Sequence, residues 1–140
     1  MKHQGAGLEI VMEKLILSAD DDRDILDCID LILSAEGYCV ITSLSPENIF
    51  QDIIHYNPDL ILLDINLGEY NGLEICKDLK SNEQTKHIIV IMLSSDDRIY
   101  EAMNCYHADA IISKPFNISE LIETIDRFLT PKIIPINRAS

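Results

Sequence analysis

The feature that most constrains the fold of this chain is a short apolar run, Leu60–Leu63, that ends in an acidic residue, Asp64. Pro58 precedes the run and a loop with two glycines, Gly68 and Gly72, follows it, so the run predicts a strand rather than part of a long helix. A strand without alternating polar residues is buried on both faces, which is typical of a parallel sheet covered by helices on each side. Ligands of such sheets bind at the carboxyl ends of the strands, so Asp64 is our candidate for the chemistry of the protein.

Further apolar segments predict the other strands of this sheet: residues 14–19, 39–42, 88–93 and 110–112. Between and after the strands, apolar residues recur at the spacing of a helix face. They predict helices within residues 23–36, 46–57, 73–80, 99–106 and 118–129. Strands that alternate with helices indicate an α/β fold with a doubly wound, five-stranded parallel sheet between two helical layers. Right-handed crossovers would place the carboxyl ends of all the strands on one rim.

Several residues predict where the helices begin. Asp22 is expected to cap the first helix rather than to take part in the site. Ser45 is a predicted N-cap with Pro46 in the first helical position. Asn117 and Glu120 resemble a capping box at the start of the last helix.

The charge of the chain argues against two classes of partner. Its 140 residues suffice for one domain with a proper core, and 24 acidic against 11 basic side chains give a formal net charge of -13. Because nucleic acids and anionic membranes are bound through clustered Lys and Arg, we expect this protein to bind neither. No apolar segment reaches the length of a membrane span, and the N-terminus lacks the apolar core of a signal peptide. We therefore expect a cytoplasmic protein.

Reactive side chains follow the predicted strands. Asp20 and Asp21 follow the first strand, Asp64 the third, Ser94 the fourth and Lys114 the fifth. Two carboxylates about 4 Å apart repel each other by about 4 kcal/mol at an effective dielectric constant of about 20, so a positive charge must offset them. The candidates are a hard divalent cation such as Mg2+ and the ammonium of Lys114. A Mg2+ ion that keeps several waters has room for a phosphate oxygen, so the site favours phosphoryl chemistry.

Together these motifs resemble the receiver domain of two-component response regulators, the CheY-like group, over about residues 13–130. The motifs are an acidic pair after the first strand, P-D-L-I-L-L-D at the third, N-G-L-E at the third helix, M-L-S-S at the fourth strand and S-K-P-F after the fifth. Any one of these motifs alone is weak evidence for the family, but the order and spacing of all five together are specific to it. The resemblance implies a flavodoxin-like sheet with the strand order 2-1-3-4-5.

The resemblance also implies a reaction. Asp64 would attack the phosphorus of a phosphohistidine, on a sensor histidine kinase or a histidine phosphotransfer protein, and would form an aspartyl phosphate. The hydroxyl of Ser94 and the ammonium of Lys114 would each contact a phosphoryl oxygen. The peptide bond before Pro115 is expected to be cis, which would help to aim Lys114.

Mg2+ is the cofactor that the resemblance implies. Asp21 and Asp64 would bind it directly through their side chains, and Asp20 mainly through water. Asn66 would contribute its backbone carbonyl. These are oxygen ligands, which a hard cation prefers.

Two positions depart from the pattern of the receiver family. Ile111 stands where an aromatic residue is usual, and its stiff side chain cannot donate a hydrogen bond. We therefore expect that coupling between the site and the fourth helix, fifth strand and fifth helix is weak, or that it follows residues 95–98. His107 stands where glycine is common, so the turn there must be made without a glycine's freedom or with the histidine in a less favoured backbone region.

We expect residues 1–12 to be a loose extension, residues 13–130 to form the receiver domain and residues 131–140 to be a tail. Such a chain would signal by contact with a downstream protein and would catalyse only its own phosphorylation and dephosphorylation. The alternative is a receiver fold that binds partners without phosphorylation. A metal-dependent phosphohydrolase fits less well because Asn66 replaces a second aspartate, and a P-loop nucleotidase is excluded because its motif does not occur.

Overall fold

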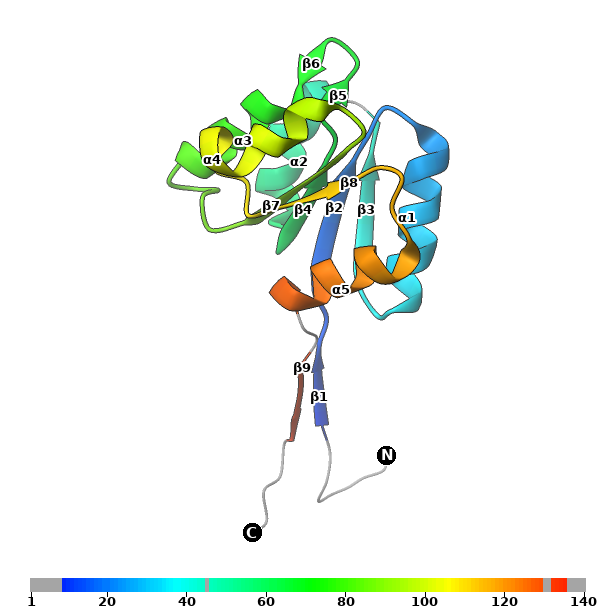
Figure 1. Cartoon of the computed structure of the whole chain (residues 1–140). Coiled ribbons are helices and arrows are strands. Elements are labelled where there is room, and N and C mark those ends of the chain that lie inside the picture. The colour runs from blue at the N-terminus through cyan, green and yellow to red at the C-terminus, as the bar shows by residue number, and fades with distance from the viewer. Residues whose placement is uncertain (1–8, 45, 130–131, 136–140) are drawn as a thin grey trace.

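The computed structural model describes residues 9–44, 46–129 and 132–135 of the chain. A central sheet of parallel strands runs through this part of the molecule (Figure 1). The strands are β2 (Leu15–Ala19), β3 (Cys39–Ser43), β4 (Leu60–Leu63), β7 (Ile89–Ser94) and β8 (Ala110–Ser113). They are all parallel and lie in the order β3-β2-β4-β7-β8, which confirms the predicted order 2-1-3-4-5.

Helices cover both faces of the sheet (Figure 1). They are α1 (Arg23–Ala35), α2 (Ile49–Tyr56), α3 (Gly72–Ser81), α4 (Ala102–Tyr106) and α5 (Ile118–Leu129). The side chains of β4 alternate between two apolar clusters. Leu60 and Leu62 pack with α1 and α5, whereas Ile61 and Leu63 pack with α2, α3 and α4. All four are at most 1% exposed, so β4 is buried on both faces as its sequence predicts.

Two of the predicted helix caps form. The carboxylate of Asp22 accepts a hydrogen bond of 2.9 Å from the backbone N–H of Asp24, which satisfies a donor at the start of α1. The side chain of Asn117 accepts one of 2.6 Å from the backbone N–H of Glu120 at the start of α5. Asp22 therefore caps α1, as predicted.

Two helices begin differently from the prediction. A 3-10 turn, η1 (Pro46–Asn48), precedes α2, so the α-helix itself begins at Ile49. A second 3-10 turn, η2 (Asp97–Glu101), precedes α4. The predicted cap Ser45 lies outside the described residues.

Two local features reflect backbone with positive φ. The loop after β4 is a small hairpin of β5 (Asn66–Leu67) and β6 (Tyr70–Asn71), in which Gly68 has φ 62°. The sequence predicts a loop here but not the pairing. His107 ends α4 with φ 67° and ψ 25°, so of the two possibilities the structure shows the second, a histidine in the left-handed conformation.

The described ends of the chain pair with each other. Strand β1 (Glu9–Met12) is antiparallel to β9 (Lys132–Pro135), with Ile10 opposite Ile134. The two strands form a ribbon that projects from the domain below α5 and is separate from the central sheet (Figure 1). These residues fall in segments that we expected to be a loose extension and a tail. Local sequence patterns do not reveal a pairing between strands so far apart in the chain.

None of the helices in the described ranges is long and apolar enough to cross a membrane. The longest of them, α1, has 13 residues, whereas a membrane-spanning helix needs about 20. Helix α1 also carries Asp24, Asp27 and Asp30 at successive turns, and such side chains are costly in hydrocarbon.

Gly72 offers a test of how tightly the start of α3 packs on the carboxyl end of β4. Its N–H donates a hydrogen bond of 2.7 Å to the carbonyl of Ile65, and a Cβ atom here would overlap the carbonyl oxygen of Asp64. We expect Gly72→Ala to lower the free energy of unfolding by about 2 kcal/mol, because the backbone of β4 must move. Urea unfolding measures this change.

Gly68→Asn is the matched control for this substitution. No atom lies within 4 Å of a Cβ built on Gly68, and asparagine tolerates the left-handed conformation at φ 62°. The control should cost less than about 1 kcal/mol. Equal effects of the two substitutions would contradict the packing that we describe.

Candidate functional site

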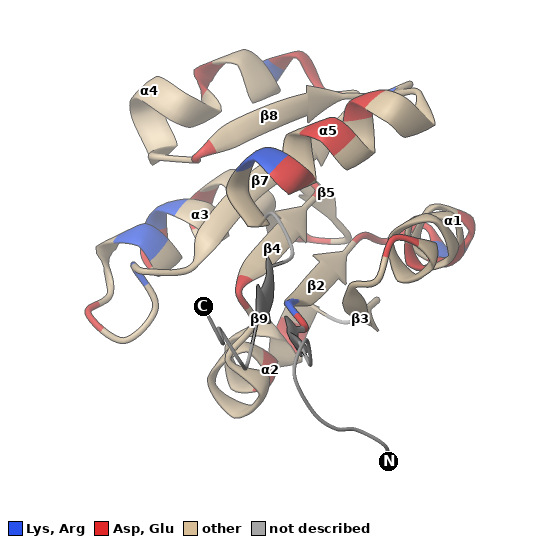
Figure 2. Ribbon diagram, turned by 90° about the horizontal axis from the view of Figure 1, so that it is seen from below, with Lys and Arg blue, Asp and Glu red and all other residues tan. Residues whose placement is uncertain are grey.

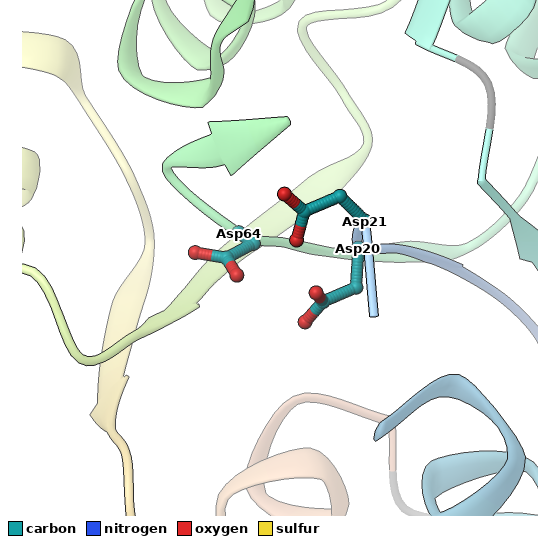
Figure 3. Close-up of side chains that lie close together, drawn as sticks. All are labelled: Asp20, Asp21 and Asp64. Carbon is teal, nitrogen blue, oxygen red and sulfur yellow. The ribbon is translucent and has the colours of Figure 1, made fainter. Parts of the chain in front are cut away.

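Three carboxylates meet at the carboxyl ends of two neighbouring strands. Asp20 and Asp21 follow β2, and Asp64 follows β4, so strand pairing brings them together although they are far apart in the sequence. One oxygen of each lies within 4.8 Å of the others (Figure 3). Asp20 is 2% exposed and Asp64 is 6% exposed, whereas Asp21 is exposed. The structure thus brings together the predicted acidic residues.

The ammonium of Lys114 partly neutralises this negative charge. Its Nζ donates hydrogen bonds of 2.7 Å to Asp20 Oδ2 and 3.0 Å to Asp64 Oδ2. Lys114 follows β8, and its backbone N–H donates to the carbonyl of Ser94 at 3.0 Å. The Lys114–Pro115 peptide bond is cis, as expected. The sequence offered two sources of positive charge, Mg2+ and Lys114. The structure shows that Lys114 forms ion pairs with two of the three carboxylates.

The environment of these charges shifts their pKa values. Burial raises the pKa of Asp20, and the hydrogen bond from Lys114 only partly opposes this effect, so that with the nearby Asp64 the pKa is about 6 instead of 3.8. Burial alone would lower the pKa of Lys114, but its hydrogen bonds to Asp20 and Asp64 outweigh burial and raise it. Lys114 therefore stays charged at neutral pH, and Asp20 holds its proton up to a higher pH in the native state than in the unfolded state.

Ser94 lies at the same rim. It ends β7, the neighbour of β4, and because Leu63 pairs with Met92, Ser94 lies beside the residues that follow Asp64. Its side chain is buried, and its Oγ accepts a hydrogen bond of 3.1 Å from the backbone N–H of Asp96. This bond leaves the proton of the Ser94 hydroxyl free for another acceptor.

Asn66 contacts the site in two ways. Its backbone N–H donates to Asp64 Oδ1 at 3.2 Å. Its exposed side-chain amide lies 3.4 Å from Asp96 Oδ2 and 3.3 Å from Nη2 of Arg98. The contact with Arg98 was not predicted, because no local pattern links residues 66 and 98.

Ile111 cannot report on Ser94 through a hydrogen bond. It is half-buried on β8 and packs against the cluster that includes α3 and α4. An aromatic hydroxyl does approach β8 from elsewhere: Tyr100, on η2, lies 3.2 Å from the hydroxyl of Ser113, the residue that pairs with Ser94. The side chain of Tyr100 is 66% exposed.

The donor set fits a hard divalent cation. Within the described ranges, the group Asp20, Asp21 and Asp64 offers three carboxylate oxygens. Ligands at about 2.1 Å from a Mg2+ ion lie about 3 to 4 Å from one another, and these oxygens all lie within 4.8 Å of one another. Exposed Asp21 leaves the group open to water, which Mg2+ retains in most protein sites.

An apolar groove lies next to Lys114. It has a volume of about 410 Å³ and runs between α1 and the segment that joins β8 to α5. Its lining is Ile25, Cys28, Ile32, Ser95, Lys114, Pro115, Phe116 and Ile118. A partner in this groove would therefore approach the buried ion pairs of Lys114.

Sequence comparison agrees with this geometry. The response regulator receiver domain matches residues 16–126. The response regulator ArlR of Staphylococcus saprophyticus is 38% identical over 114 residues, which make up 81% of this chain and 51% of ArlR. The chain spans about half the length of the curated relatives that it matches.

Solved structures are similar as well. The BeF3-activated DrrB receiver domain has a TM-score of 0.74 and 30% identity, and the match covers 85% of this chain and 99% of that one. The chemotaxis protein CheY4 of Vibrio cholerae has a TM-score of 0.76 and 24% identity, with 84% and 100% covered. At 24% identity, the likeness to CheY4 shows the fold alone.

The raised pKa of Asp20 predicts how stability depends on pH. Between about pH 4 and pH 6 the native state binds more protons than the unfolded state, so the free energy of unfolding should fall as the pH rises through this range. Asp20→Asn removes this fall. In the absence of divalent cations at pH 7.5, we expect the variant to be more stable than the wild type by about 1 to 3 kcal/mol.

Urea unfolding at several pH values measures both effects. Asp27→Asn, which also replaces a carboxylate by an amide but on the exposed surface of α1, is the control and should leave the pH dependence unchanged. An Asp20→Asn variant with the stability and pH dependence of the wild type would refute the prediction.

Proposed function

Because this chain belongs to the response regulator receiver domain family, whose members act in two-component phosphorelay signalling, we propose that Asp64 accepts a phosphoryl group. The donor would be a phosphohistidine of a sensor histidine kinase or of a histidine phosphotransfer protein. The observation that carries the proposal is the buried Asp64 carboxylate, held by the Lys114 ammonium beside Asp20 and Asp21. The protein would catalyse only its own phosphorylation and dephosphorylation.

The proposed reaction is a transfer from nitrogen to oxygen. An oxygen of Asp64 attacks the phosphorus, the bond between phosphorus and the histidine nitrogen breaks, and a new bond to Asp64 forms. Negative charge gathers on the phosphoryl oxygens during the transfer, and Lys114 and the hydroxyl of Ser94 would stabilise it there. Lys114 would exchange part of its contact with Asp64 for a phosphoryl oxygen.

Mg2+ is the proposed cofactor. It would be held by the side chains of Asp21 and Asp64, by Asp20 mainly through water, and by the backbone carbonyl of Asn66. When bound, the ion supplies positive charge that neutralises the carboxylates and the incoming phosphoryl group. The three neighbouring carboxylates of Asp20, Asp21 and Asp64 support this assignment, because a hard cation prefers oxygen ligands.

The groove beside Lys114 supports a protein donor. Its apolar lining suits the apolar side of a helix that carries the phosphohistidine, and exposed Asp24 and Asp27 on α1 suit basic residues next to it. Figure 2 shows acidic residues along α1. The formal net charge of -13 argues against nucleic acid as a ligand. The signal would instead pass to a downstream protein target by direct contact.

Acetyl phosphate provides a test without a kinase. Incubated with acetyl phosphate and Mg2+, the wild type should gain the mass of one phosphoryl group, measured by intact-protein mass spectrometry. Asp64→Asn should gain none because an amide is a poor nucleophile. Asp78→Asn, with the same change on the exposed surface of α3, should react like the wild type. A wild type without any mass gain would favour a receiver fold that binds partners without phosphorylation.

Binding of Mg2+ has its own test. At a free Mg2+ concentration about ten times the dissociation constant, the ion should add about 1.4 kcal/mol to the free energy of unfolding of the wild type. Asp21→Asn should lose most of this gain, while its stability in EDTA stays within about 0.5 kcal/mol of the wild type because Asp21 is exposed. Equal stabilisation of both proteins by Mg2+ in urea unfolding would exclude Asp21 as a ligand.

A further inference from the structure

A cluster of three side chains lies on the solvent side of Asp64. The guanidinium of Arg98 donates two hydrogen bonds to the carboxylate of Asp96, from Nε at 3.0 Å and from Nη2 at 2.6 Å. The same Nη2 lies 3.3 Å from the side-chain oxygen of Asn66, whose amide nitrogen lies 3.4 Å from Asp96. Each of the three side chains thus contacts the other two.

The cluster is attached to the reacting groups through the backbone. The N–H of Asn66 donates to Asp64, the proposed phosphoacceptor, and the N–H of Asp96 donates to the hydroxyl of Ser94. Arg98 is therefore two contacts from Asp64 on one side and from Ser94 on the other. It connects the loop after β4 with the loop after β7.

The contacts of Arg98 change what Asp96 and Asn66 can do. An aspartyl phosphate is lost when a water oxygen attacks the phosphorus, the bond to the Asp64 oxygen breaks, and a base accepts a proton of the water. A free carboxylate beside the site could orient that water and accept its proton. Here both oxygens of Asp96 accept hydrogen bonds from Arg98, so the carboxylate is already engaged and is not free to orient a water or to accept its proton.

We propose that Arg98 is a positioning residue that prolongs the life of the phosphoryl group on Asp64, because it holds Asp96 and Asn66 together and away from an attacking water. This inference rests on the proposed function, since it concerns the loss of the same phosphoryl group. The pair of Arg98 and Asp96 is exposed to solvent, which allows an effect on the phosphoryl lifetime to be distinguished from an effect on folding. Pairs exposed to solvent add little to stability, so removing Arg98 should change the lifetime and leave folding intact.

The test follows the decay of phosphorylated protein after acetyl phosphate is removed, by intact-protein mass spectrometry in the presence of Mg2+. Arg98→Gln should lose the phosphoryl group about tenfold faster than the wild type, because Asp96 becomes available as a base. Arg98→Lys keeps the charge but not the forked geometry, and it should decay at an intermediate rate. Arg127→Gln on α5 removes the same charge from another surface and should decay like the wild type.

A double-mutant cycle then asks whether Arg98 acts through Asp96. In an Asp96→Asn background, Arg98→Gln should have little further effect on the decay rate. Equal or slower decay of Arg98→Gln, or an undiminished effect in the Asp96→Asn background, would overturn the inference while leaving the proposed function intact. A wild type that gains no phosphoryl mass would overturn both.

Discussion

The contact of one ammonium with two buried carboxylates constrains how the carboxyl ends of the strands can meet. The buried carboxylates of Asp20 and Asp64 would repel each other strongly, and Lys114 lies within hydrogen-bonding distance of both. These three groups come from β2, β4 and β8, so they meet only when the strands lie in the observed order. The apolar strands supply that order, because each must be covered on both faces. The strand order that buries the apolar side chains in the core therefore also brings the charged side chains together at the carboxyl ends of the strands.

The site is arranged for charge at the expense of stability. Asp20 is buried with only partial compensation, as its raised pKa indicates, and burial of a charge costs free energy. The surrounding packing limits how far the site can relax: the start of α3 lies directly against the backbone at Asp64, where only glycine fits at residue 72. Sites held this firmly are preorganised, and preorganised sites stabilise developing charge without the cost of reorganisation.

The solvent side of the rim differs from its buried side. There the contacts are made by exposed side chains of the loops after β4 and β7, with Arg98 at the centre. These contacts add little to folding, so they can vary in sequence without loss of the domain. They are nevertheless attached through backbone N–H groups to Asp64 and Ser94. The hydroxyl groups of Tyr100 and Ser113 provide a further contact between the segment after β7 and β8, where Ile111 cannot form a hydrogen bond.

The sequence alone determined the alternation of strands and helices, the burial of β4 and the residues that follow each strand, because these depend on local periodicity and on capping. It thereby indicated Asp20, Asp21, Asp64, Ser94 and Lys114 as one site. Only the tertiary structure decided that Lys114 contacts both Asp20 and Asp64, that Arg98 contacts Asn66, and that β1 pairs with β9. The partners in these contacts are separated by 94, 50 and 32 residues for the side-chain pairs, and by nearly the whole chain for the strands. No local pattern carries information about such pairs, because they form only when the packed sheet brings distant loops together.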